Sequence, residues 1–151
     1  TCLKDGSKCY VGLRKANAVG VIDMAKLELM KTIETGPDAN RLYLNPGNNR
    51  YGLFANESGK SDIVSIIDTQ KDVKVKDIWT GLGPHNVAFD PDGKFAVIST
   101  KKENVATLVD TASADPNEWD VITTDLDSGI QNNGVRWVPS PAALKKALAQ
   151  N

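Results

Sequence analysis

His85 is the only histidine among the 151 residues, so any chemistry that needs an imidazole must use it. An imidazole titrates close to neutral pH and can serve as a general acid–base or as a metal ligand. Copper and zinc usually take several histidine or cysteine ligands, and this chain offers no second histidine. No Gly-x-Ser-x-Gly nucleophile motif occurs either. We therefore expect no catalytic residues in this chain alone, and a structural or binding role for His85 before a metal-binding one.

Other polar residues recur in segments like the one that holds His85. The three segments are TGPDAN (residues 35–40), TGLGPHN (residues 80–86) and SGIQNN (residues 128–133). Our alignment places Asp38, His85 and Asn132 at one position, and Asn40, Asn86 and Asn133 near another. Loops held by a rigid scaffold are where binding residues often gather. We expect these six residues to form a ligand-binding site.

A repeat connects these segments. The runs VGVIDM, VSIIDT and ATLVDT each end a β-rich stretch, and their aspartates, Asp23, Asp68 and Asp110, follow at intervals of 45 and 42 residues. An aspartate at the end of a strand accepts hydrogen bonds from the backbone of the next turn. We therefore interpret the three aspartates as turn residues rather than as a carboxylate site.

Each repeat contains four short β-type runs separated by turn residues such as Asp-Gly and Pro-Gly. Four strands in 40–45 residues are typical of a β-propeller blade. The predicted fold is all-β, with about three and a half blades. The blades should cover about residues 1–36, 41–81 and 86–127, with the first strand of a further blade at residues 134–138. Residues 139–151 should form a short C-terminal helix, with Ser140 as its N-cap.

The stretch from residue 53 to residue 100 resembles the YVTN family of β-propeller repeats. It has that family's Ala-Asn turn, its apolar-Ile-Asp-Thr strand, its Gly-x-x-Pro junction and its Pro-Asp-Gly-Lys turn. The resemblance implies that the first strand of each blade lines a central channel. The six polar junction residues would then lie at the channel mouth.

Two functions stay open. The first is an exported binding or scaffold protein that needs no cofactor and binds a partner at the channel mouth. The second is a segment of a periplasmic redox enzyme that takes part in electron transfer. Propellers similar to this one carry copper or haem in nitrous oxide reductase and cytochrome cd1 nitrite reductase. In that case His85 would be a ligand of the metal or haem.

The composition gives no support for two classes of partner, nucleic acid and membranes. A net charge of −1 gives no support for binding nucleic acid, and no apolar run is long enough to span a membrane. Cys2 and Cys9 flank an Asp-Gly hairpin signal, and we expect a disulfide between them. A disulfide favours a periplasmic or extracellular location.

A propeller must close its ring to remove exposed strand edges. Three and a half blades cannot do so. We therefore expect the missing blades to come from a longer chain or from another propeller chain in a homo-oligomer or larger complex.

Overall fold

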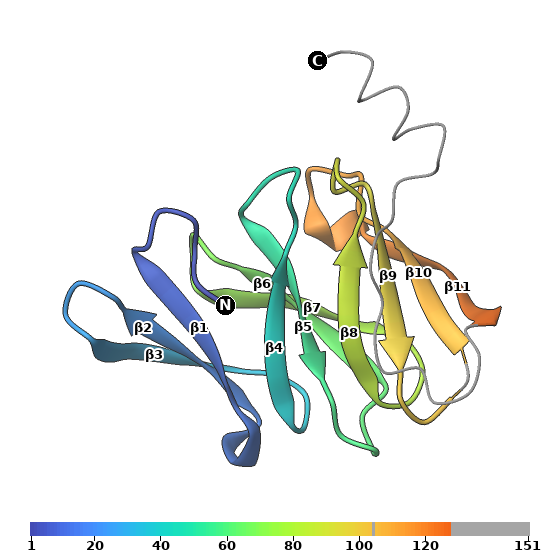
Figure 1. The fold of residues 1–151 in the computed structure, drawn as a ribbon, viewed down its shortest axis with the longest axis horizontal. Coiled ribbons are helices and arrows are strands. Elements are labelled where there is room, and N and C mark those ends of the chain that lie inside the picture. The colour runs from blue at the N-terminus through green and yellow to red at the C-terminus, as the bar shows by residue number, and fades with distance from the viewer. Residues whose placement is uncertain (104, 128–151) are drawn as a thin grey trace, which may run out of the picture.

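The computed structural model describes residues 1–103 and 105–127, which form three antiparallel sheets standing side by side (Figure 1). The first sheet contains β1 (Lys8–Leu13), β2 (Ala18–Asp23) and β3 (Glu28–Glu34). The second contains β4 (Ala39–Leu44), β5 (Tyr51–Asn56), β6 (Ile63–Asp68) and β7 (Val73–Trp79). The third contains β8 (Pro84–Phe89), β9 (Phe95–Thr100), β10 (Val105–Asp110) and β11 (Asp120–Asp127). Two single-turn 3-10 helices, η1 (Arg14–Ala16) and η2 (Pro116–Glu118), complete the described elements.

Strands follow one another within each sheet in chain order, as in a β-meander. The all-β prediction is confirmed. The further strand predicted at residues 134–138 and the helix predicted at residues 139–151 lie outside the described residues. At the start of the first sheet, Cys2 pairs with Cys9 as a single β-bridge, and the structure links the two cysteines by a disulfide.

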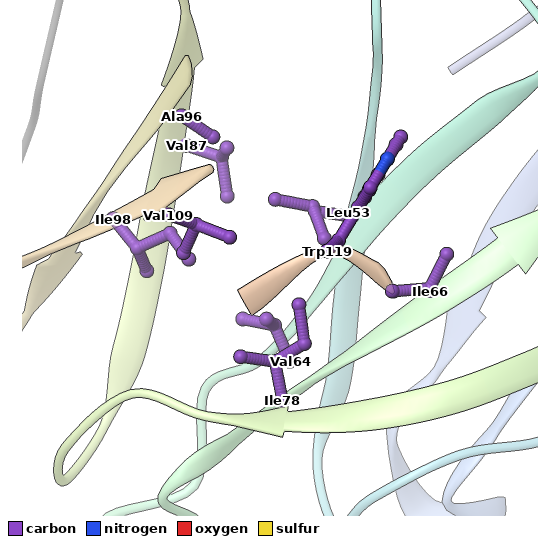
Figure 2. Packing of buried hydrophobic residues seen from close by; sticks show 9 residues of the cluster. All are labelled: Leu53, Val64, Ile66, Ile78, Val87, Ala96, Ile98, Val109 and Trp119. Atoms are coloured by element: carbon purple, nitrogen blue, oxygen red, sulfur yellow. The ribbon is translucent and has the colours of Figure 1, made fainter. Parts of the chain in front are cut away.

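Alternating side chains bury both faces of the second sheet, because successive residues of a strand point to opposite faces. On β5, Phe54 packs toward the first sheet with Tyr10, Val19 and Val21. The preceding residue, Leu53, packs toward the third sheet. Figure 2 shows this second core, in which residues of the second sheet face residues of the third: Leu53, Val64, Ile66 and Ile78 against Val87, Ala96, Ile98, Val109 and Trp119. These two layers hold the sheets at fixed positions relative to one another.

The repeated aspartates act in turns, as predicted. The Oδ1 atom of Asp23 accepts backbone hydrogen bonds from Ala25 and Lys26, at 2.9 and 3.1 Å. Asp68 and Asp110 bond to the residue two positions later, both at 2.9 Å. Each aspartate ends a strand, β2, β6 or β10, and its side chain stabilises the turn that follows.

Candidate functional site

The junctions between sheets and the loops after β1, β5 and β9 gather at one end of the molecule. β4 and β8 begin at this end, and β5 and β9, which run antiparallel to them, finish there. It is the lower end in Figure 1, where η1, the start of β4 and the loops after β5 and β9 lie together. The polar junction residues predicted from the sequence must therefore meet at this end.

Glu57, directly after β5, is the centre of this end. Its side chain is only 11% exposed. Asn40 on β4 donates from Nδ2 to Glu57 Oε2 at 2.7 Å, and Arg14 Nη1 lies 3.4 Å from the same oxygen. His85 Nε2 lies 3.2 Å from Oε1, which also forms an ion pair with Lys101 Nζ. One carboxylate therefore joins groups from all three sheets.

Asp38 holds Arg14 in place. Arg14 donates from Nε to Oδ1 at 2.5 Å and from Nη2 to Oδ2 at 2.8 Å, a two-pronged pair. The hydrogen bond from Arg14 lowers the pKa of Asp38, and the bond to Asp38 raises the pKa of Arg14. The backbone N–H of Asp38 in turn donates to Asn17 Oδ1 at 3.1 Å. Arg14 is therefore oriented so that its remaining nitrogen faces Glu57.

Asn86 and Tyr43 hold His85 from the other side. Asn86 Nδ2 lies 2.9 Å from His85 Nδ1, and Tyr43 donates its hydroxyl to Asn86 Oδ1 at 2.5 Å. The neutral tautomer that fits both contacts accepts from the Asn86 amide at Nδ1 and carries its proton on Nε2, toward Glu57. Burial raises the pKa of Tyr43, so its hydroxyl remains a donor. We call the seven residues Arg14, Asp38, Asn40, Glu57, His85, Asn86 and Lys101 the Glu57 cluster.

The structure corrects the alignment of the junctions. Glu57 N donates to Asp38 O at 3.1 Å, and Lys101 N donates to Gly83 O at 2.8 Å in the same way. Asp38 and Gly83 also share a left-handed backbone, with φ of 62° and 73°. Gly83 is therefore the counterpart of Asp38, and the prediction that His85 shares its position is wrong.

The two junctions align without a gap, so His85 corresponds to Asn40 and Asn86 to Arg41. Even so, Asp38, Asn40, His85 and Asn86 all belong to the Glu57 cluster. Asn132 and Asn133 lie outside the described residues.

Sequence reasoning missed Arg14, Glu57 and Lys101. A signal was present, because Glu57 and Lys101 hold the same position, directly after the second strand of successive sheets. A charged residue repeated at that position, with opposite sign, predicts an ion pair if neighbouring loops meet. Arg14 shares this position, because it directly follows β1, and strand pairing makes β1 the counterpart of β5 and β9.

The described residues offer no group of several ligands for a copper site, and a haem would have to use His85 as its one histidine ligand. In residues 1–103 and 105–127, no three histidine, cysteine or acidic side chains come together as metal ligands. Both ring nitrogens of His85 also have protein groups at hydrogen-bond distance, Glu57 and Asn86. For His85 to bind a metal, it would first have to give up one of these contacts.

Two hollows in the described part of the chain lie away from the Glu57 cluster. One, of about 260 Å³, lies between β7 and β11 beside Trp79 and Trp119. The other, of about 240 Å³, lies among turns that include Asn45 and Gly93. The Glu57 cluster lines neither hollow, and its Arg14, Asp38 and Lys101 side chains are 52%, 31% and 33% exposed.

Comparisons with known proteins address the fold. No family model and no curated protein matches the chain. Among solved structures, hydrazine synthase from Kuenenia stuttgartiensis matches with a TM-score of 0.66 and 27% identity, over 80% of this chain and 36% of that one. A putative 6-phosphogluconolactonase from Bacteroides fragilis matches with a TM-score of 0.67 and 20% identity, over 86% of this chain and 39% of that one. Dihydro-heme d1 dehydrogenase NirN, in complex with DHE, matches with a TM-score of 0.66 and 18% identity, over 88% of this chain and 28% of that one.

All three are β-propeller proteins. The described residues have the fold of β-propeller blades. It spans less than half the length of each of these proteins, and the resemblance to YVTN repeats stays a prediction. Within the described residues, no helix has the length and apolar character needed to cross a bilayer.

Proposed function

We propose that this propeller segment is a binding module, not an enzyme by itself, and that the Glu57 cluster receives an acidic group of its partner. The observation that carries the proposal is the convergence of Arg14, Lys101 and His85 on one carboxylate, at an end built from all three sheets. Loops fixed by a rigid scaffold keep such a group of charges in place for a partner.

The cations are the outer members of the cluster. The Arg14 side chain is 52% exposed, and that of Lys101 is 33% exposed, whereas Glu57 lies beneath them. An approaching carboxylate therefore meets Arg14 and Lys101 before it meets Glu57. The Lys101 ammonium has three N–H donors, and Glu57 is its one partner in the described hydrogen bonds. The remaining donors are available to an acidic side chain.

A third cation enlarges this positive surface. Lys102 is exposed, and its side chain lies over Gly59 and Gly83, so that a Cβ added at Gly83 would be 3.1 Å from Lys102 Cγ. A row of cations beside a partly neutralised carboxylate attracts an acidic segment and sets its orientation. Ion pairs between these exposed cations and a partner's acidic groups each contribute little to affinity alone, and salt weakens them.

Calorimetric titration with a hexaglutamate peptide tests the proposal. Lys101→Gln should weaken binding roughly two- to fivefold, the effect expected from the loss of one exposed ion pair. Glu57→Gln should strengthen binding, because it removes the competing negative charge. Lys31→Gln is the control, since it makes the same charge change on an exposed part of β3. Equal affinities for the Lys101→Gln and Lys31→Gln proteins would contradict the proposal, as would tighter binding of hexalysine.

The second candidate is a copper- or haem-dependent redox segment with His85 as ligand. Its support is the similarity to dihydro-heme d1 dehydrogenase NirN, which at 18% identity concerns the fold alone. An absorption spectrum and metal analysis of protein isolated from its source distinguish the two candidates. Bound haem or copper that disappears with His85→Gln would favour the redox segment.

We also propose a periplasmic or extracellular location. The Cys2–Cys9 disulfide supports it, because disulfides persist in oxidising compartments and are rare in reducing ones. Fractionation of the source cells, followed by detection of the chain with an antibody, tests the location. Recovery in the reducing cytoplasm would overturn it.

A further inference from the structure

The first sheet has a second apolar face, turned away from the second sheet. Tyr10, Val19, Val21 and Ile33 pack into the core between the two sheets. On the opposite face, Val11, Leu13 and Leu29 converge above Gly20, because a Cβ added to Gly20 would lie 3.1 to 3.4 Å from all three. We call Val11, Leu13, Ile22 and Leu29 the outer face of the first sheet. Val11 is 41% exposed and Leu29 is 58% exposed.

The repeat allows this face to be compared with the equivalent face of the second sheet. Strand pairing makes Val11 the counterpart of Phe54 and Ile22 the counterpart of Ile67. Phe54 and Ile67 are fully buried, and the sheet that covers them is the first sheet. The same positions are therefore covered by a neighbouring sheet in one repeat, whereas in the other Val11 is exposed and Ile22 is half-buried. The outer face of the first sheet matches a surface that already binds a propeller sheet.

The chain also carries the complementary face. The first sheet covers Phe54 and Ile67 with Tyr10, Val19 and Val21, and strand pairing makes Val97, Ala106 and Leu108 the counterparts of these residues in the third sheet. Val97 and Leu108 are opposite each other in the β9–β10 register. They lie on the side of the third sheet opposite Ile98 and Val109, which pack toward the second sheet. On this side Ala106 is buried and Val97 and Leu108 are half-buried. One copy of the chain thus carries the residues of both halves of a sheet-to-sheet contact.

We infer that the outer face of the first sheet docks on the Val97–Leu108 face of a second copy, in the same sheet-to-sheet packing that joins the sheets within one chain. Each copy of a symmetric pair then supplies one half of each of two equivalent contacts. The contact is head-to-tail, and a head-to-tail contact either closes into a ring or propagates. Closure with two copies gives a dimer. The inference does not depend on the Glu57 cluster, whose residues lie at the end of the sheets rather than on this face.

Sedimentation of the whole chain over a range of concentrations tests the inference. The unaltered protein should sediment as a dimer at high micromolar concentration. Val11→Lys places a charge in one half of the contact, and Leu108→Glu places an opposite charge in the other half. Each variant alone should associate roughly tenfold or more weakly. Leu27→Lys is the control, because Leu27 is 75% exposed in the β2–β3 turn, and it should remain dimeric.

Mixing the two variants distinguishes a disrupted contact from poor folding of either variant. In a dimer of one Val11→Lys chain and one Leu108→Glu chain, one contact pairs the two opposite charges and the other contact is unaltered. Mixing the two variants should therefore restore the dimer. A monomer at every concentration for the unaltered protein would overturn the inference, and so would a Val11→Lys protein that dimerises as well as the unaltered one. Failure of the mixture to associate, with both variants folded by circular dichroism, would also overturn it.

Discussion

Glu57 Oε1 lies 3.2 Å from His85 Nε2, and this contact joins the loop after β5 to the first residues of β8. The two residues belong to different repeats, whose sheets share an apolar core. The contact is thus the polar counterpart of that core at one end of the molecule. Because Arg14 and Lys101 approach the same carboxylate, its removal affects three sheets at once.

Glu57→Ala should lower the free energy of unfolding by about 1–3 kcal/mol, because it leaves Arg14, Lys101 and the Asn40 amide without their shared acceptor. Urea unfolding at neutral pH measures the change. Glu28→Ala, an exposed site on β3, is the control and should change stability by less than about 0.5 kcal/mol. Equal losses for the two variants would show that the Glu57 contacts contribute nothing to folding.

Gly93→Ala should be far more destabilising than Gly6→Ala, although both glycines have positive φ, 69° and 70°. At Gly6 nothing lies within 4 Å of the added Cβ, so the cost is that of the left-handed backbone, about 1 kcal/mol. At Gly93 the Cβ would collide with Asn45 Oδ1, an atom held by a 2.8 Å bond from Gly47 N. We expect a loss of about 2–4 kcal/mol there. Thermal unfolding of the two variants side by side makes the comparison, and similar midpoints would contradict it.

Asp68 should make folding sensitive to acid. Burial raises its pKa, but Arg50 and the backbone N–H groups of Lys71 and Gln70 outweigh burial, and the pKa falls below its ordinary value of 3.8. A carboxyl group with a lowered pKa in the folded state stabilises the fold above its unfolded pKa. That stabilisation is lost as the pH falls through the lower, folded value.

Asp68→Asn should therefore reduce stability by about 1–2 kcal/mol at neutral pH, and the difference from the unaltered protein should shrink below about pH 4. Urea unfolding across that range measures both effects. Asp92→Asn, which makes the same charge change at an exposed turn position, is the comparison. A constant difference between the Asp68→Asn protein and the unaltered protein at all pH values would refute the assignment.

The Cys2–Cys9 disulfide should protect both thiols from alkylation in the denatured, unreduced chain. Mass measurement before and after iodoacetamide treatment decides the point, and uptake of two alkyl groups would rule the bridge out. Since the closed loop is short, its loss should cost only about 2–3 kcal/mol in the chain-entropy model. Cys2→Ser/Cys9→Ser in urea unfolding measures this contribution.

The sequence predicted the sheets well, because the signals are local and repeated. Asp23, Asp68 and Asp110 mark strand ends through hydrogen bonds to neighbouring residues in the chain, and this pattern needs no long-range information. The same holds for the alternation that sends Phe54 and Leu53 into different cores.

The candidate site was predicted only in part, because it depends on which loops meet. The junction residues Asp38 and His85 were found from their repeated context. Glu57, the residue that joins them, lies in another loop, and its partner Arg14 is 43 residues away in the chain. The alignment error arose because polar character was matched instead of backbone conformation. The left-handed φ shared by Asp38 and Gly83 reveals the correct register.

The ring of His85 offers the most direct test of the Glu57 cluster as a site for acidic groups. As the only histidine, it gives one set of imidazole signals in a proton–carbon NMR spectrum. Titration with hexaglutamate should shift these signals to saturation in the unaltered and Lys31→Gln proteins, with a weaker midpoint in the Lys101→Gln protein. Saturable binding of hexaglutamate that leaves the His85 signals unmoved would place the acidic group elsewhere and contradict the account.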